Sequence, residues 1–227
     1  AALFAGFYAI IAAMSGFFTA ACLAIVIAGF LDAVDGRIAR LTNTQSNFGM
    51  QYDSMSDLVA FGVAPAILLF NWALVDFGKI GWILAFLYMS CATLRLARFN
   101  TMPDSAVFYG LASPAAAGTS TTMVWTWVDN FGPVLDNLFV SVAVGVYTLA
   151  VALLMVSNVR YFNPKHFKAR VPYPYMIAAV LLFIVVMIYP PGVLFAVGLV
   201  YAVSGPLQLI IRYIKGDRKA PDPPDPH

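Results

Sequence analysis

The chain has 227 residues, of which 61% are hydrophobic and 11% charged, and its mean hydropathy is +0.82. Because an average soluble domain carries about 25% charged residues, this composition excludes an ordinary soluble domain and predicts an integral membrane protein. The formal net charge of +2 is too small to indicate binding to nucleic acid.

Apolar segments of membrane-spanning length follow one another along the chain. A transmembrane helix needs about 20 mostly apolar residues, so we expect an all-α polytopic protein with about eight transmembrane helices. Only Ser15 and Gly16 separate the first two segments, so one long helix is an alternative there. The sequence Tyr189–Pro190–Pro191–Gly192 predicts a turn before the last segment, because proline lacks a backbone donor and glycine accepts positive φ. The expected spans lie near 1–15, 17–35, 52–75, 80–98, 113–129, 134–157, 174–190 and 192–212.

We expect these spans to form one transmembrane domain over residues 1–215. The polar, proline-rich tail at 216–227 should be disordered. The chain begins without an initiator Met, so we expect its amino terminus to be trimmed or incomplete. Cys22 and Cys91 lie in apolar stretches without a neighbouring Cys or His at metal-ligand spacing, so neither a disulfide nor a zinc site is expected.

The basic residues predict the orientation of the spans, because cytoplasmic loops carry the excess of Lys and Arg. On the expected map, Lys79 is the one basic residue on its side of the membrane, and the other twelve share the opposite side. This distribution favours eight spans with both ends in the cytoplasm. The twelve are Arg37, Arg40, Arg95, Arg98, Arg160, Lys165, Lys168, Arg170, Arg212, Lys215, Arg218 and Lys219.

Four of the eleven acidic residues, Asp32, Asp35, Asp53 and Asp57, lie within twenty-six positions at the expected cytoplasmic ends of the second and third spans. An unpaired Asp at the bilayer centre costs about 2.5–3.5 kcal/mol, so the cluster needs compensation. The spacings of three and four place each pair on one helix face. If the two faces meet, they form an all-oxygen site suited to a divalent cation such as Mg²⁺ or Mn²⁺, with room for two ions.

Neighbouring residues favour a phosphate-containing ligand at this site. Gly36 allows close approach to the helix backbone, and the guanidinium groups of Arg37 and Arg40 match phosphate oxygens. Structural ion pairing of the acids with these two arginines is an alternative, although two cations compensate four anions poorly. A cation-coupled transporter, whose intramembrane Asp residues bind the driving ion, is a second alternative.

The acids and their neighbours form one spaced motif. It reads Asp32-x-x-Asp35-Gly36-x-x-Ala39-Arg40, eight residues, Gly49, three residues, Asp53, three residues, Asp57. This motif resembles that of the CDP-alcohol phosphatidyltransferase family. The segments 41–46, 51–58, 95–100 and 154–161 are similar to the phosphatidylserine synthase branch of that family.

The resemblance implies a homodimeric membrane enzyme, surrounded by membrane lipids, with six core helices around a polar cavity open to the cytoplasm. It implies transfer of a phosphatidyl group from CDP-diacylglycerol to L-serine, with the enzyme in a bacterial inner membrane. Asp57 would act as general base and also touch a metal. The other implied roles are metal binding by Asp32, Asp35 and Asp53, and CDP-diacylglycerol binding by Gly36, Arg40, Ser46 and Gly49.

The serine carboxylate needs a cationic partner, and Arg95, Arg98 and Arg160 are the candidates for serine or phosphate contact. Arg95 and Arg98 share a helix face, but they could instead extend to the membrane interface. Arg160 could belong to a loop that sets topology or contacts anionic lipid. Glycerol 3-phosphate or inositol phosphate is the alternative acceptor, and either would need a more cationic pocket than serine does.

Overall fold

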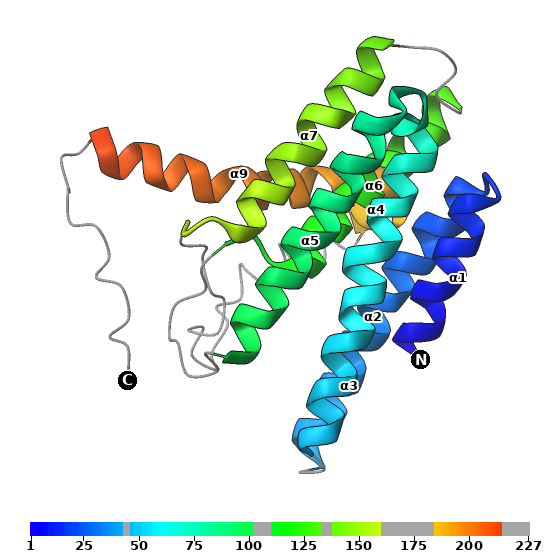
Figure 1. Ribbon diagram of the computed structural model, residues 1–227. Coiled ribbons are helices and arrows are strands. Elements are labelled where there is room, and N and C mark those ends of the chain that lie inside the picture. Colours follow the sequence, from blue (N-terminus) through cyan, green and yellow to red (C-terminus); the bar gives the residue numbers. More distant parts are fainter. Residues whose placement is uncertain (43–45, 102–109, 133–137, 160–183, 215–227) are drawn as a thin grey trace.

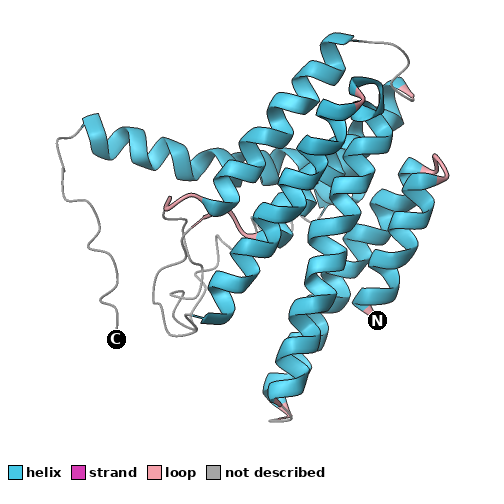
Figure 2. Cartoon of the chain, viewed as in Figure 1, coloured by secondary structure: helices cyan, strands magenta, loops and turns pink. Residues whose placement is uncertain are grey.

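The computed structural model describes residues 1–42, 46–101, 110–132, 138–159 and 184–214 (Figure 1). Within these ranges every regular element is helical and there is no strand (Figure 2). The helices are α1 (Ala2–Met14), α2 (Phe18–Leu41), α3 (Asn47–Asp57), η1 (Leu58–Val63), α4 (Ala64–Leu69), η2 (Phe70–Leu74), η3 (Val75–Phe77), α5 (Lys79–Thr101), α6 (Ser113–Phe131), α7 (Leu138–Val156) and α9 (Pro190–Ile214).

Five helical segments of the described chain are long and apolar enough to cross a membrane, which confirms the expected all-α polytopic class. Two expected spans are helices that fall outside this set. Helix α1 is apolar but has only 13 residues, and α6 has 19 residues but carries several Ser and Thr side chains. Most of the expected span at 174–190 lies outside the described residues. The five segments are Phe18–Ala39, Asn47–Phe77, Lys79–Thr101, Leu138–Val156 and Pro190–Gln208.

The sequence predicted a break in the helices at Ser15–Gly16 and a turn at 189–192, and the structure differs between these two places. A short turn separates α1 from α2, with Gly16 at φ +77°, so two helices replace the single long one considered as an alternative. The turn expected over residues 189–192 is confined to Tyr189, since α9 already begins at Pro190. Proline is accepted in the first helical turn because the backbone N–H that it lacks has no intrahelical acceptor there.

The third span is one helical run, Asn47–Phe77, that changes its winding along its length. It begins as α3, becomes the π-helix η1 immediately after Asp57, returns to α4 and widens again in η2. π-helical turns inside α-helices are rare and occur frequently at functional sites. Here the change in winding separates the acidic face of α3 from the apolar core that begins with Ala60 and Phe61.

Helix α1 packs against both α2 and the third span, and so holds the two acidic helices at a fixed spacing. The approach is close, because a Cβ atom on Gly6 would lie 2.9 Å from the Ala60 Cα atom. Small residues permit such backbone approach between membrane helices. On the other side of the molecule, α5 packs against α7, and α6 packs against α2 and α9. Helix α9 crosses the other helices and extends away from them (Figure 1).

Candidate functional site

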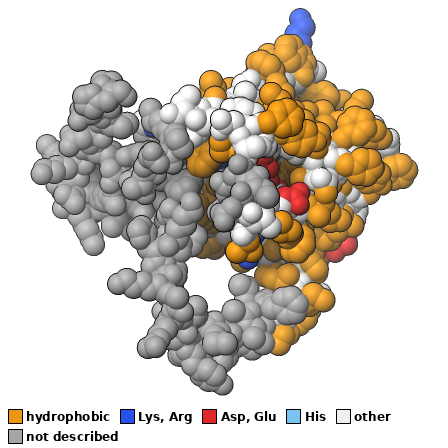
Figure 3. Space-filling model, turned by 90° about the horizontal axis from the view of Figure 1, so that it is seen from below, with side chains coloured by type: hydrophobic (Ala, Val, Ile, Leu, Met, Phe, Trp, Pro, Cys, Tyr) orange, Lys and Arg blue, Asp and Glu red, His pale blue; other side chains and the backbone are white. Residues whose placement is uncertain are grey.

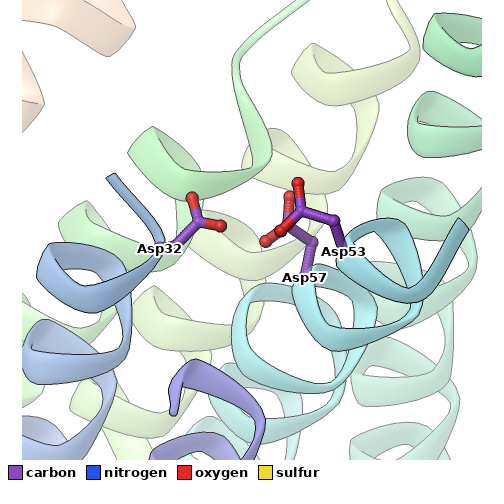
Figure 4. A group of neighbouring side chains, drawn as sticks. All are labelled: Asp32, Asp53 and Asp57. Atoms are coloured by element: carbon purple, nitrogen blue, oxygen red, sulfur yellow. The ribbon is translucent and has the colours of Figure 1, made fainter. Parts of the chain in front are cut away.

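Three carboxylates from two helices converge in the half of the molecule that contains the end of α2 and the start of α3. Asp32 comes from α2, and Asp53 and Asp57 come from successive turns of α3 (Figure 4). One carboxylate oxygen from each residue lies within 4.8 Å of the others. Asp32 and Asp57 are half-buried, whereas Asp53 is exposed. The expected meeting of the two acidic helix faces is therefore present for these three residues.

Asp35 lies one turn further along α2, is exposed, and does not belong to the group of three. It is still close enough for electrostatic repulsion with Asp32 and Asp53. Its role as a metal ligand stays a prediction.

The group of three has the properties expected of a site for a hard divalent cation. All its donors are carboxylate oxygens, which Mg²⁺, Mn²⁺ and Ca²⁺ prefer. The Asp57 Oδ1 atom is buried and has no hydrogen-bond partner among the described residues. A buried carboxylate oxygen without a partner is costly. The residues present thus fit a cation shared among Asp32, Asp53 and Asp57.

Acidic side chains are visible in the view from below, next to hydrophobic side chains (Figure 3). The exposed hydrophobic residues near the acids include Phe48, Tyr52 and Met55 of α3. An acidic centre bordered by apolar surface suits a ligand with a charged head and an apolar body.

Ser46 and Gly49 form the start of α3. Ser46 adopts an extended conformation, φ −124° and ψ 155°, and its Oγ accepts a hydrogen bond of 3.0 Å from the Gly49 backbone N–H. This is the N-cap arrangement, which satisfies one of the free N–H groups in the first turn. A Cβ atom on Gly49 would lie 3.1 Å from the Ser46 Oγ. Both residues thus have a structural role, and their predicted contacts with CDP-diacylglycerol stay predictions.

Of the other predicted ligand-binding residues, the structure describes Gly36 in full, Arg40 without its side chain, and Arg160 not at all. Gly36 is half-buried on α2, between Asp35 and the exposed Arg37.

Arg95 of α5 brings a cation to the acidic group. Its Nη1 donates a hydrogen bond of 2.9 Å to the Ser113 Oγ, and its charge attracts that of Asp57. Its Nε is buried and has no partner among the described residues. Arg95 is half-buried rather than extended to the membrane interface, and its contact with serine or phosphate stays a prediction.

Arg98 lies one turn later and is held by a different partner. Its Nη1 donates a hydrogen bond of 3.0 Å to the Asn158 Oδ1, which ties the end of α5 to the segment after α7. Two residues on, the Asn100 Nδ2 donates to the Ser54 Oγ at 3.0 Å. Because Ser54 lies next to Asp53, this bond fixes the acidic helix α3 against the arginine-bearing helix α5.

The short segment before α6 is bound through its backbone to the end of α7 and to the segment after α7. The Gly110 N–H donates to the Val159 carbonyl oxygen at 2.9 Å, and the Leu111 N–H donates to the Leu154 carbonyl oxygen at 3.0 Å. Gly110 has φ +79°, and a Cβ atom there would lie 2.3 Å from the Met155 carbonyl oxygen. The sequence predicted no contacts for Ser113, Asn100 and Asn158, because their partners are 18, 46 and 60 residues away. The family-like segments 95–100 and 154–161 contain Asn100 and Asn158 and are the signal that could have pointed to them.

The fold and the site together define an integral membrane protein with an acidic, oxygen-donor centre at one end of its helices. A family model of CDP-alcohol phosphatidyltransferases matches residues 1–129. The chain belongs to the CDP-alcohol phosphatidyltransferase family, as the Asp32–Asp57 motif predicted. This confirms the enzyme class expected from the sequence.

Relatives with assigned activities cover much of the chain. It is 34% identical to the CDP-diacylglycerol–serine O-phosphatidyltransferase of Helicobacter pylori, over 96% of this chain and 92% of the relative. It is also 34% identical to the enzyme of the same name from Methanocaldococcus jannaschii, over 85% and 84% of the two chains. The archaetidylserine synthase of Methanothermobacter thermautotrophicus is 36% identical over 69% of this chain and 64% of that protein.

Proposed function

We propose that this protein transfers the phosphatidyl group of CDP-diacylglycerol to the hydroxyl of L-serine, giving phosphatidylserine and CMP. The observation that carries the proposal is the convergence of Asp32, Asp53 and Asp57 within 4.8 Å, in a chain of the family that performs this class of transfer. The names of the relatives support serine as acceptor, since the relatives from Helicobacter pylori and Methanocaldococcus jannaschii are both serine phosphatidyltransferases.

In this proposal Asp32, Asp35 and Asp53 hold one or two divalent cations, Mg²⁺ or Mn²⁺, and Asp57 shares in binding them. When bound, a divalent cation supplies positive charge that stabilises the diphosphate and the departing phosphate. Gly36, Arg40, Ser46 and Gly49 bind the CDP part of the lipid. The lipid tails lie against the apolar surface beside the acidic centre.

The chemical step needs a base and an aligned acceptor. Asp57 takes the proton of the serine hydroxyl as the serine oxygen attacks the phosphorus that carries the diacylglycerol. The bond from that phosphorus to the bridging oxygen breaks, and CMP leaves with the electron pair. Most of the rate enhancement of a phosphoryl transfer comes from positioning and electrostatic stabilisation, which the rigid helices α2, α3 and α5 provide. A carboxylate has two oxygens, so Asp57 can take the proton on one of them while the other shares in binding a cation.

The proposal includes an orientation in the membrane, which the distribution of basic residues supports. Asp32, Asp53, Asp57 and Arg95 share one end of the molecule, and Lys79 begins α5 at the other end. Because basic residues gather on the cytoplasmic side, the proposal places the active site there, facing soluble serine. A bacterial inner-membrane location, contact with membrane lipids and the homodimer are further parts of the proposal, and they rest on the family resemblance alone.

The decisive experiment uses purified full-length protein, CDP-diacylglycerol in detergent micelles and labelled serine. We expect phosphatidylserine and CMP to form in equal amounts, to stop with EDTA, and to return with excess Mn²⁺ or Mg²⁺. Asp57→Asn should lower kcat by about 10²–10⁴-fold, the usual contribution of a general base. Asp129→Asn, which changes an exposed carboxylate near the opposite end of α6, is the matched control and should keep full activity.

Two results would refute the proposal in distinguishable ways. Product formation with glycerol 3-phosphate or inositol phosphate but not with serine would overturn the acceptor. Undiminished activity in EDTA or in Asp57→Asn would overturn the assigned chemistry.

A further inference from the structure

We propose that Ser113 is a positioning residue, which orients Arg95 so that its guanidinium group binds the anionic part of the acceptor next to Asp57. The proposal rests on the function proposed above, because it concerns the acceptor side of the same site. It concerns a residue outside the Asp32–Asp57 motif, on helix α6, which carries none of the four Asp residues of that motif.

The first observation is the contact itself. Arg95 Nη1 donates to Ser113 Oγ at 2.9 Å, and the Ser113 side chain is completely buried. A long arginine side chain has many rotamers, so a fixed acceptor at its end reduces the conformational freedom that must be lost when a ligand binds. A serine hydroxyl adds no charge, and so it fixes Arg95 without neutralising it.

The second observation is that the contact with Ser113 leaves another hydrogen-bond donor of Arg95 without a partner among the described residues. The Arg95 Nε and the Asp57 Oδ1 are both buried and have no hydrogen-bond partner within the described part of the chain. The two side chains attract each other electrostatically. They are thus an available donor on α5 and an available acceptor on α3, and we assign both to one small molecule that has an anionic group and a hydroxyl. An amino acid with a hydroxyl side chain has this combination of groups.

The third observation is that Ser113 is itself anchored. It is the first residue of α6, and the segment before it is bound to the end of α7 through the backbone N–H groups of Gly110 and Leu111. The Leu111 side chain is completely buried. The end of α7 therefore fixes the position of Ser113, and Ser113 in turn fixes the guanidinium group of Arg95 that we assign to the acceptor.

The test compares steady-state kinetics of Ser113→Ala, Ser113→Thr and the wild type, in the same micellar assay. We expect Ser113→Ala to raise the KM for serine about tenfold, the effect of losing one hydrogen bond to a charged group. The KM for CDP-diacylglycerol should change less than twofold. Ser113→Thr keeps the hydroxyl and should recover most of the serine affinity. Ser120→Ala removes another completely buried hydroxyl of α6, one that contacts Tyr147 instead, and should leave the serine KM unchanged.

Several outcomes would overturn the proposal. They are an unchanged serine KM in Ser113→Ala, an equal rise in both KM values, a fall in kcat alone, or a loss that Ser113→Thr does not recover. The wild-type reaction separates this test from that of the proposed function. If the wild type uses glycerol 3-phosphate instead of serine, the proposal that serine is the acceptor is wrong. The same variants, measured with glycerol 3-phosphate, then still test whether Ser113 acts through Arg95 on an anionic acceptor.

Discussion

Replacing Gly110 by Ala should destabilise the protein more than the same change at any exposed turn. Gly110 has φ +79°, and the added Cβ would lie 2.3 Å from the Met155 carbonyl oxygen and 3.1 Å from the Ser157 carbonyl oxygen. The backbone has to move away, which breaks the hydrogen bonds that Gly110 and Leu111 donate to Val159 and Leu154.

The magnitude follows from these contributions. A non-glycine residue in the left-handed region costs about 1–2 kcal/mol, and each of the two backbone hydrogen bonds contributes about 0.5–1.5 kcal/mol. The sum is about 2–5 kcal/mol, which corresponds to a fall in Tm of about 4–20 °C for a chain of this size. Because Ser113 follows three residues later, the serine KM should rise as well.

The assay is thermal unfolding in detergent, followed by the fluorescence of the four Trp residues. Gly16→Ala is the matched control, because Gly16 has φ +77° but a Cβ there would meet nothing within 4 Å. It should show only the conformational cost, about 1–2 kcal/mol. Equal Tm shifts in the two variants would refute the reasoning, since the contact with Met155 would then have no effect.

Two further predictions concern how the acidic helix is held. Ser46→Ala should lower the free energy of unfolding by about 1 kcal/mol through loss of the N-cap, whereas Ser46→Asp keeps a capping oxygen and should not lower it. Thermal unfolding measures both variants. Equal Tm values for Ser46→Ala and the wild type would contradict the capping role. Asn100→Ala removes the 3.0 Å bond to Ser54 and should cost about 0.5–1.5 kcal/mol and lower kcat. Thr101→Ala removes a side-chain bond that stays within α5; it is the control and should keep kcat unchanged.

The sequence predicted the three converging acids well, for a simple geometric reason. Residues four apart on an α-helix differ by about 40° around the axis, so Asp53 and Asp57 necessarily share a face. Asp32 and Asp35 are three apart and also share a face. Which of the two approaches Asp53 and Asp57 depends on how α2 is placed against α3, and the spacing within α2 does not contain that information.

The remaining contacts of the site could not be read from spacing within one helix. The partner of Arg95 depends on how α5 and α6 pack, and the partner of Ser54 depends on how α3 and α5 pack. Hydropathy places helices along the chain but contains no information on these relative rotations. The turn predicted from Pro190, Pro191 and Gly192 is shorter than expected, because proline is compatible with both a turn and the first turn of a helix.

The π-helical winding of η1 has a consequence for how sequences of this family can vary. A π-helical turn holds one residue more than an α-helical turn, so it behaves as a one-residue insertion that the helix has absorbed. Loss of one residue between Leu58 and Val63 can tighten this turn to ordinary α-helix while the acids upstream and the buried side chains downstream keep their phases. The acidic part and the apolar part of the third span should therefore keep their relative rotation when one residue is lost here.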